Sequence, residues 1–287
     1  KISRIYPNGE LFSHVLGQID DSNNGISGLE KTFDYELTSS RKPLILTLDT
    51  DLQYLIREEL LKSKDIFQNI GSAAILMDIN NGDILSIVSL PDFDLNKREK
   101  INDIKFINRA TKAVYEFGSV FKTFTLAAGI NYNLINPETE FKELKKRIIC
   151  AGNTISEYDE KIPSDLTAEN ILIRSGNIGS ARIAEKIGIE KYDKFLKTIG
   201  ILKSIDFDID EIGETQMGRW GKCKLLTVGF GHGIATTLLQ LTKGYSIISN
   251  GGFDVSPTLI QKNNYKKTKR ILNEEVSNKI NPILRKI

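Results

Sequence analysis

The sequence predicts an α+β protein built on an antiparallel sheet with helices on both sides. Two stretches rich in Ile, Val and Leu, residues 71–78 and 83–89, flank the dipeptide Asn81-Gly82, which is a strong signal for a tight β-hairpin turn. Helical segments precede and follow this hairpin without a regular alternation of strand and helix, which favours α+β over a parallel α/β fold. Only two or three convincing strands are visible, and a two-stranded sheet is marginally stable, so we expect the sheet to be incomplete in this chain.

The other elements follow from hydrophobic periodicity, helix caps and chain breakers. Up to the middle of the chain we predict a turn-rich linker at 1–42, a buried strand at 44–48, a helix at 50–64 opened by the capping pattern Thr50-x-x-Gln53, an irregular stretch at 90–118, a helix from Gly118 to Asn133 and a loop-rich excursion at 134–165. Beyond it we predict helices at 168–174 (capped by Thr167), 178–187 and 190–198, a turn at 230–233, a helix at 238–249 opened by Thr237-x-x-Gln240, and a last helix from Glu274 that contains Pro282.

Length and composition narrow the class of protein. The 287 residues are 40% hydrophobic and 26% charged, which is ordinary for a globular protein of one large domain with an appendage. The net charge of +2 comes from acids and bases that are interspersed, which argues against a nucleic-acid partner. The sequence contains no apolar run of eighteen residues, so it predicts no membrane-spanning segment.

Cysteine and histidine content gives little sign of metal or redox chemistry. Cys150 and Cys223 are far apart and belong to no Cys-x-x-Cys motif, so two unpaired thiols are favoured over a single disulfide, which would need an oxidising compartment. His14 and His232 show no metal-ligand spacing, and no phosphate-binding loop is present. We therefore expect neither a metal nor a cofactor.

The candidate nucleophile lies in the segment Tyr115-Glu-Phe-Gly-Ser-Val-Phe-Lys-Thr-Phe124. Ser119 falls in the first turn of the helix predicted there, and Lys122 follows three residues later, within side-chain reach. A serine hydroxyl is weakly nucleophilic and needs an adjacent base, and a buried lysine with a lowered pKa can be that base. We expect Ser119 Oγ to lie beside Lys122 Nζ, and burial by the flanking aromatic residues to lower the pKa of Lys122. A second Ser-x-x-Lys at Ser39–Lys42 lies in a polar run and is interpreted as a loop.

Two further patterns accompany this pair. Ser175-Gly-Asn177 lies at the junction of two predicted helices, where Ser and Asn are also common simply as helix caps. Phe230-Gly-His-Gly233 is predicted to be a turn in front of an amphipathic helix. If the patterns belong to one site, the side chain of Ser175 or Asn177 should lie close to both Ser119 and Lys122.

Together these motifs resemble the transpeptidase domain of class B penicillin-binding proteins, a fold shared with the serine β-lactamases. Ser-Gly-Asn stands where other members have Ser-Asp-Asn or Ser-Ser-Asn, and Tyr-Glu-Phe-Gly-Ser-Val-Phe-Lys and Gly-His-Gly-Ile are closer to the division-specific subgroup than to the elongation one. The resemblance runs through nearly the whole chain and also covers Arg4–Pro7, His14–Gly17, Gly25–Glu30, Leu46–Asp49 with Leu52-Gln53, Asn108–Ala110 and Asn250–Gly252. It implies that residues 1–42 are the end of an N-terminal non-catalytic module with its linker, and that residues 43–287 are the transpeptidase domain.

The resemblance implies a peptidoglycan D,D-transpeptidase that cross-links stem peptides in septal cell-wall synthesis and is a target of β-lactams. Ser119 would attack the penultimate D-alanine, Lys122 would take its proton and Ser175 would pass a proton to the leaving D-alanine. Asn177 would bind the substrate amide and help to fix Lys122. The residues implied at the substrate are Gly118, Gly231, His232 and Gly233. The implied partners are stem peptides, β-lactam antibiotics and division-complex membrane proteins, without nucleic acid.

The resemblance also implies a cellular location, and it shows that one of the family's motifs is missing from the sequence. An N-terminal anchor absent from this chain would hold the protein in the bacterial inner membrane, with the catalytic domain in the periplasm. The family's third motif, Lys-Thr-Gly or Lys-Ser-Gly, does not occur in the sequence, and residues 273–287 resemble the helix that precedes it. The C-terminal part of the domain is therefore expected to be missing and the chain as given to be inactive or weakly active.

Two alternative functions are also considered. One is a catalytically incomplete scaffold that binds division partners. The other is a serine β-lactamase-like hydrolase in which Glu157, Glu160 or Glu169 would be the deacylation base.

Overall fold

The computed structural model describes residues 4–40, 42–97, 104–262, 264 and 268–287. The parts of the predicted linker 1–42 and irregular stretch 90–118 that fall on residues 1–3, 41 and 98–103 lie outside the described residues. The helices are α1 (Ser13–Leu16), α2 (Gly28–Thr32), α3 (Asp34–Ser39), α4 (Thr50–Phe67), α5 (Lys122–Asn131), α6 (Ala168–Ile173), α7 (Asn177–Ile187), α8 (Ile189–Thr198), α9 (Lys222–Val228), α10 (Leu238–Ser249) and α11 (Glu274–Leu284), with short 3₁₀ turns η1 (Ile104–Phe106) and η2 (Gly118–Phe121). The strands are β1 (Ser72–Met77), β2 (Ile84–Leu90), β3 (Glu140–Phe141), β4 (Arg147–Cys150), β5 (Asn153–Ser156), β6 (Leu166–Thr167), β7 (Gln216–Met217) and β8 (Ile234–Ala235).

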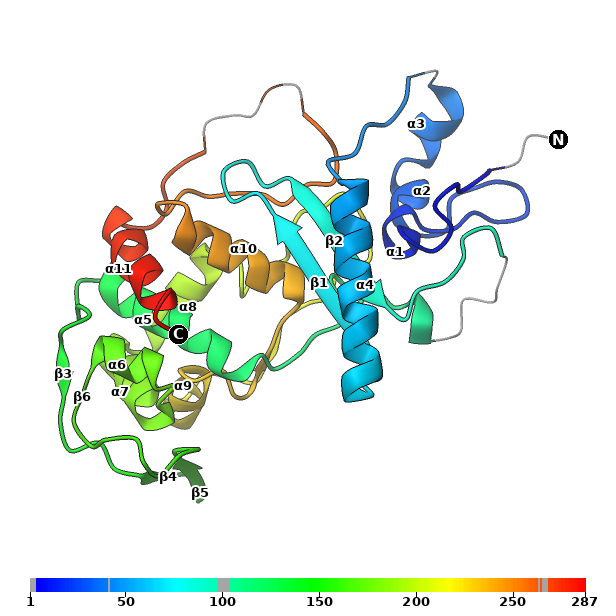
Figure 1. Ribbon diagram of the computed structural model, residues 1–287. Coiled ribbons are helices and arrows are strands. Elements are labelled where there is room, and N and C mark those ends of the chain that lie inside the picture. The colour runs from blue at the N-terminus through cyan, green and yellow to red at the C-terminus, as the bar shows by residue number, and fades with distance from the viewer. Residues whose placement is uncertain (1–3, 41, 98–103, 263, 265–267) are drawn as a thin grey trace.

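The predicted hairpin is confirmed as the antiparallel pair β1–β2, in which Ala74 faces Val88 and Ile75 faces Ile87. Helix α4 packs against β2 and helix α10 against β1, so helices flank the hairpin (Figure 1). Among the described residues every sheet has two strands, and one isolated bridge, between Asp83 just before β2 and Thr258, lies beside the hairpin. Helices combined with small antiparallel sheets confirm the α+β class.

The start of α4 differs from the prediction. The cap is Asp49, whose carboxylate accepts the N–H groups of Asp51 and Leu52 at 2.9 and 3.0 Å. Gln53 does not complete a capping box with Thr50, because its buried amide bonds to the hairpin, with Nε2 donating to the Ile87 carbonyl at 2.9 Å and Oε1 accepting from the Ile87 N–H at 2.9 Å. Gln53, which gave the apparent capping signal, therefore hydrogen-bonds helix α4 to strand β2.

The strand predicted at 44–48 is wrong. Leu46 forms one isolated bridge to Ile260, and the Thr47 N–H donates to the Leu259 carbonyl at 2.9 Å. Leu46 and Leu48 are partly buried against the core, whereas Ile45 is exposed, so the segment is less buried than predicted. The neighbouring backbone is itself an irregular loop, so no continuous ladder forms.

A cluster of helices carries the main hydrophobic core. Helix α5 is its centre, with the side chains from Lys122 to Ile130 all buried, and it packs against α6, α7, α8 and α11. The predicted caps of α6 by Thr167 and of α10 by Thr237 with Gln240 are confirmed, as is the start of α11 at Glu274. Helices α1, α2 and α3, which lie in the predicted turn-rich linker 1–42, and helix α9 were not predicted, because their four to seven residues carry too short a periodic pattern. Ser39, which was predicted to lie in a loop, is the last residue of α3.

The loop-rich excursion predicted at 134–165 contains more structure than expected. Strand β3 pairs with β6, and β4 and β5 form a hairpin that projects from the lower edge of the molecule (Figure 1). Cys150, at the end of β4, forms a disulfide with Cys223 in α9, with the two Cα atoms 5.6 Å apart. The expectation of two unpaired thiols is wrong, because folding brings together cysteines that are 73 residues apart in the sequence.

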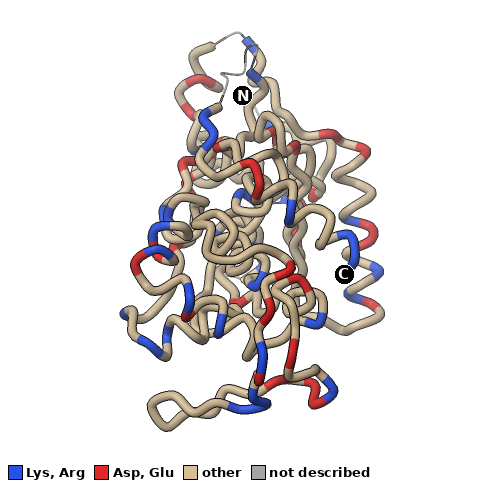
Figure 2. The backbone as a smooth tube through the Cα atoms, turned by 90° about the vertical axis from the view of Figure 1, so that its left-hand side faces the viewer, with Lys and Arg blue, Asp and Glu red and all other residues tan. Residues whose placement is uncertain are grey.

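The surface carries charges of both signs without segregation. Lys and Arg are interspersed with Asp and Glu along the backbone trace (Figure 2), in keeping with the small net charge. Of the helices in the described part of the chain, none is both long enough and apolar enough to cross a bilayer.

Candidate active site

The position of Ser119 is set by a tight turn in front of α5. Gly118 has a φ of +56°, which glycine adopts at little cost, and the chain then forms one 3₁₀ turn before the α-helix begins at Lys122. The predicted helix therefore starts as a 3₁₀ turn. The hydroxyl of Tyr245 in α10 donates to the Val120 carbonyl at 2.7 Å, and burial raises the pKa of Tyr245 to about 12. Ser119 itself is exposed, so a substrate can reach it.

The Lys122 side chain is buried directly beneath this turn, with 1% of its surface exposed. Its Nζ donates to Ser119 Oγ at 3.1 Å, to Ser175 Oγ at 2.9 Å and to the Ser175 carbonyl at 2.5 Å. The predicted contact between Ser119 and Lys122 is confirmed, and Ser175, which was expected close to both, contacts Lys122.

Burial lowers the pKa of Lys122 from 10.5 to about 8, and the negative charge of Glu157 opposes part of this shift. The direction agrees with the prediction from the aromatic neighbours. An amine with a pKa near 8 is partly neutral at physiological pH, and the neutral amine has a lone pair that can accept the Ser119 proton. An accessible hydroxyl beside a buried, partly neutral amine is suited to acyl transfer.

The Ser175-Gly-Asn177 segment is the turn between α6 and α7. Ser175 has a φ of +53°, unusual for a residue with a Cβ, and such backbone geometry concentrates at functional sites. Asn177 does not meet the expectation that it helps to fix Lys122. Its side-chain nitrogen donates to the Ser156 carbonyl at 2.9 Å, and no described contact joins it to Lys122. It points instead to the β5 strand, which the sequence analysis treated as loop.

The Phe230–Gly233 segment is the predicted turn, and it packs against the start of the Ser119 turn. A Cβ placed on Gly231 would lie 1.9 Å from the Gly118 carbonyl oxygen, so only glycine allows this approach. Glu116 holds the rest of the turn: its carboxylate lies 3.1 Å from His232 Nδ1 and accepts the Gly233 N–H at 3.2 Å. All four residues expected at the substrate therefore lie at or next to the Ser119 turn.

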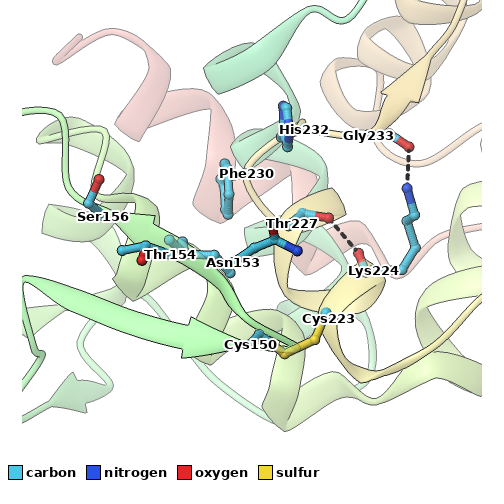
Figure 3. A pocket seen from close by; sticks show the side chains of 11 residues that line it. Cys150, Asn153, Thr154, Ser156, Cys223, Lys224, Thr227, Phe230, His232 and Gly233 are labelled. Atoms are coloured by element: carbon cyan, nitrogen blue, oxygen red, sulfur yellow. Dashed lines mark hydrogen bonds between the residues drawn. A yellow bond between two sulfur atoms is a disulfide. The ribbon is translucent and has the colours of Figure 1, made fainter.

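A cavity of about 650 Å³ lies between this turn, the β4–β5 hairpin and α9 (Figure 3). Its polar lining includes Ser156, Lys224 and His232, and the Lys224 Nζ donates to the Gly233 carbonyl at 3.0 Å. The Cys150–Cys223 disulfide forms part of the wall (Figure 3). The Ser156 carbonyl accepts from Asn177 Nδ2, and His232 Nδ1 lies beside the Glu116 carboxylate, so two lining residues contact the segments that carry Ser175 and Ser119.

Sequence reasoning missed three contributors to this site: Glu157, Glu116 and the disulfide. Glu116 belongs to the Tyr115–Phe124 segment, so its place beside the nucleophile was available from position alone. Glu157 was considered only as a hydrolytic base. Its carboxylate accepts the N–H groups of Asn177 and Ile178 at the start of α7, a contact that depends on the unpredicted hairpin.

Residues 72–287 match the family model described as the penicillin binding protein transpeptidase domain. This match covers well over half of the chain. The chain therefore belongs to the penicillin-binding protein transpeptidase family, as its motifs had indicated.

Curated relatives match almost the whole chain. It is 28% identical over 290 residues to the "Probable peptidoglycan D,D-transpeptidase FtsI" of Caulobacter vibrioides, covering 98% of this chain and 49% of the relative. It is 27% identical over 319 residues to the peptidoglycan D,D-transpeptidase FtsI of Buchnera aphidicola, covering 96% of this chain and 53% of the relative. The chain thus spans about half the length of these curated relatives.

The fold is also that of solved relatives. The crystal structure of penicillin binding protein 3 from Mycobacterium tuberculosis matches with a TM-score of 0.87 at 24% identity, over 99% of this chain and 69% of that one. The same protein complexed with aztreonam matches equally well, with a TM-score of 0.87 and 24% identity, over 99% of this chain and 68% of that one. At this level of identity the match shows the shared fold.

Proposed function

We propose that this chain is the catalytic part of a serine-type peptidoglycan D,D-transpeptidase that acts in septal cell-wall synthesis and is acylated by β-lactams. The observation that carries the proposal is the buried Lys122 ammonium group, 3.1 Å from the exposed Ser119 Oγ and 2.9 Å from Ser175 Oγ. The septal role rests on the resemblance of the Tyr115–Lys122 and Gly231–Ile234 sequences to the division-specific subgroup.

The geometry supports a two-step acyl transfer. Neutral Lys122 accepts the hydroxyl proton as Ser119 Oγ forms a bond to the carbonyl carbon of the penultimate D-alanine. The bond to the terminal D-alanine breaks, and the proton reaches the leaving amine through Ser175. An amine of a neighbouring stem peptide then attacks the ester, which forms the cross-link and returns the proton to Ser119. Asn177 provides a hydrogen bond to the substrate amide. This role is compatible with its contact with Ser156, which uses the side-chain nitrogen.

The substrate would lie across the Ser119 turn and the adjoining cavity. Gly118, Gly231, His232 and Gly233 would border it, with the Ser119 N–H as one donor for the developing oxyanion. β-Lactams would enter the same site, since they imitate the D-alanyl-D-alanine end. The solved complexes of the Mycobacterium tuberculosis relative with aztreonam and ampicillin support this part of the proposal.

The cellular setting is part of the proposal. Residues 1–42 would be the end of a non-catalytic module with its linker, and residues 43–287 would belong to the transpeptidase domain. The Cys150–Cys223 disulfide supports an oxidising compartment such as the periplasm, because disulfides rarely persist in the cytosol. A membrane anchor elsewhere in the protein and contacts with division-complex membrane proteins complete this setting.

The contacts of the three glutamates argue against a β-lactamase-like hydrolase. Both carboxylate oxygens of Glu157 accept backbone N–H groups of α7, which leaves this group poorly placed to activate water. Glu160 faces Arg147 at 3.7 Å, and Glu169 is bound to Lys286 at 2.6 Å. None of these groups is presented to Ser119 as a free base.

A transpeptidation assay tests the proposal. Full-length protein would be incubated with a pentapeptide donor and an amine acceptor, and D-alanine release and cross-linked product would both be measured. The proposal predicts cross-linked product, and its loss in Ser119→Ala. Rapid turnover of a β-lactam without cross-linking would instead support the hydrolase, and a folded protein without D-alanine release would support the scaffold.

A further inference from the structure

Glu157 joins the β4–β5 hairpin to the catalytic turn. It directly follows β5, and its Oε2 accepts the Asn177 N–H at 2.6 Å while its Oε1 accepts the Ile178 N–H at 2.9 Å. These are the first two N–H groups of α7, and Gly176, the N-cap residue, has no side chain to satisfy them. The cap of this helix therefore comes from a segment twenty residues away in sequence.

We propose that Glu157 is a positioning residue of the active site, which holds the Ser175–Asn177 turn against Lys122. The inference rests on the proposed acylation of Ser119, and it assigns to Glu157 a supporting role in that reaction. It differs from the hydrolytic role considered from the sequence, because Glu157 acts through the backbone of the Ser175–Asn177 turn and does not touch the substrate.

The turn needs such support because of its backbone geometry. Ser175 is in the left-handed region, where a residue with a Cβ is disfavoured and persists only when its surroundings fix it. At its entry, the Ser175 and Gly176 N–H groups donate to the carbonyls of Leu172 and Ile171 at 3.0 and 2.9 Å. At its exit, the Asn177 N–H is held by Glu157. The Asn177 side chain also donates to the Ser156 carbonyl, and Ser180 Oγ donates to the Gly176 carbonyl. Removing the carboxylate takes away the bond to the exit N–H, which loosens the position of the two Ser175 oxygens that contact Lys122.

Glu157 also acts on Lys122 by its charge. The groups in contact with the Lys122 ammonium are Ser119 from η2 and Ser175 from the α6–α7 turn, and neither hydroxyl titrates in this pH range. Among the described residues, Glu157 is the charged group whose field acts on Lys122, and it raises the pKa that burial lowers. The carboxylate thus keeps the base partly protonated, and its removal makes Lys122 less basic.

The location of Glu157 is itself fixed at two points. Its own N–H donates to the Lys146 carbonyl at 3.0 Å, which continues the hairpin ladder by one pair. At the other end of the hairpin, Cys150 is bonded to Cys223 in α9. A segment anchored in this way can serve as a rigid support for a carboxylate.

The test compares Glu157→Gln and Glu157→Ala with the matched control Glu160→Gln. Glu160 is exposed, three residues away, and carries the same charge without contacting α7. Acylation by a fluorescent penicillin would be measured in full-length protein from pH 6 to 10, with rates divided by the concentration of titratable sites. We expect Glu157→Gln to shift the pH midpoint downward and Glu157→Ala to lower the high-pH plateau about tenfold or more, as misplacement of catalytic groups does. Glu160→Gln should stay within about twofold of wild type.

The near-isosteric Glu157→Gln keeps the test decisive if Glu157→Ala folds poorly. An unchanged midpoint and plateau in both variants, even with a lower melting temperature, would reduce Glu157 to a helix cap and overturn the proposal. Failure of the wild-type protein to be acylated at Ser119 would instead refute the proposed function, so the two failures are distinguishable.

Discussion

Replacing Lys122 by methionine tests the role of the buried amine, because the two side chains have similar volumes and methionine cannot be a base. The structure gives the energetic scale. A pKa lowered from 10.5 to about 8 means that burying the ammonium form costs about 3 kcal/mol near pH 7. Methionine removes this cost but leaves the Ser175 oxygens without their donor, a loss of about 1–3 kcal/mol. The free energy of unfolding at pH 7 should therefore change by no more than about 2 kcal/mol.

The sign of the pH dependence follows from the direction of the shift. Between pH 8 and 10.5 the unfolded chain binds a proton at this lysine that the folded protein does not, so the stability of the wild type rises with pH in that window. Lys122 alone should contribute about 2 kcal/mol of added stability between pH 7 and 9.5. The variant should lack this increment, whereas Lys62→Met, on the exposed surface of α4, should keep it.

Urea unfolding at pH 7 and 9.5 measures the increment, and fluorescent penicillin labelling of the same samples measures the chemistry. Loss of the general base should slow acylation by about 10²–10⁴-fold in a folded variant. A Lys122→Met protein that is acylated at the wild-type rate, or that keeps the wild-type pH increment in stability, would refute the reasoning.

Three further predictions concern the pH profile, the disulfide and the Gly231 turn. Acylation of the wild type should rise about tenfold from pH 7 to a plateau above pH 9, since only about a tenth of Lys122 is neutral at pH 7; a flat profile in stopped-flow measurements would contradict a lysine base. The Cys150→Ser/Cys223→Ser double variant should lose about 2–4 kcal/mol in urea unfolding, and a reducing agent should weaken the wild type but leave the double variant unchanged. Gly231→Ala should reduce acylation at least about tenfold, because its Cβ would meet the Gly118 carbonyl. Gly152→Ala is the control, because Gly152 has a similar φ of +80° but an added Cβ would meet no atom within 4 Å. Equal losses of acylation in both variants would mean that backbone strain alone causes the effect.

The sequence was informative wherever the relevant contact is local. Ser119 and Lys122 are three residues apart on one helical turn, so their spacing, together with the flanking aromatic residues, predicted that they meet. The β1–β2 hairpin was equally accessible, because its turn dipeptide and its two apolar runs are adjacent in the chain. The caps at Thr167 and Thr237 are local in the same sense.

Contacts made across the fold could not be found in this way. The apparent capping residue Gln53 bonds to β2, and Asn177 bonds to Ser156, because hairpins elsewhere in the chain provide their partners. The Cys150–Cys223 disulfide spans 73 residues and depends on how the β4–β5 hairpin packs over α9. Ser175 was placed near Lys122 by resemblance, since no local rule brings a residue 53 positions away into the site.

The measurement that tests the central claim most directly is the location of the covalent adduct. Full-length protein would be treated with a β-lactam, digested with trypsin and analysed by mass spectrometry. Cleavage after Lys112 and Lys122 releases the peptide 113–122, in which Ser119 is the one serine. The account predicts that the acyl group is found on this peptide and that Ser119→Ala abolishes it. An adduct on another peptide, or none on folded protein, would contradict the assignment of Ser119 as the nucleophile.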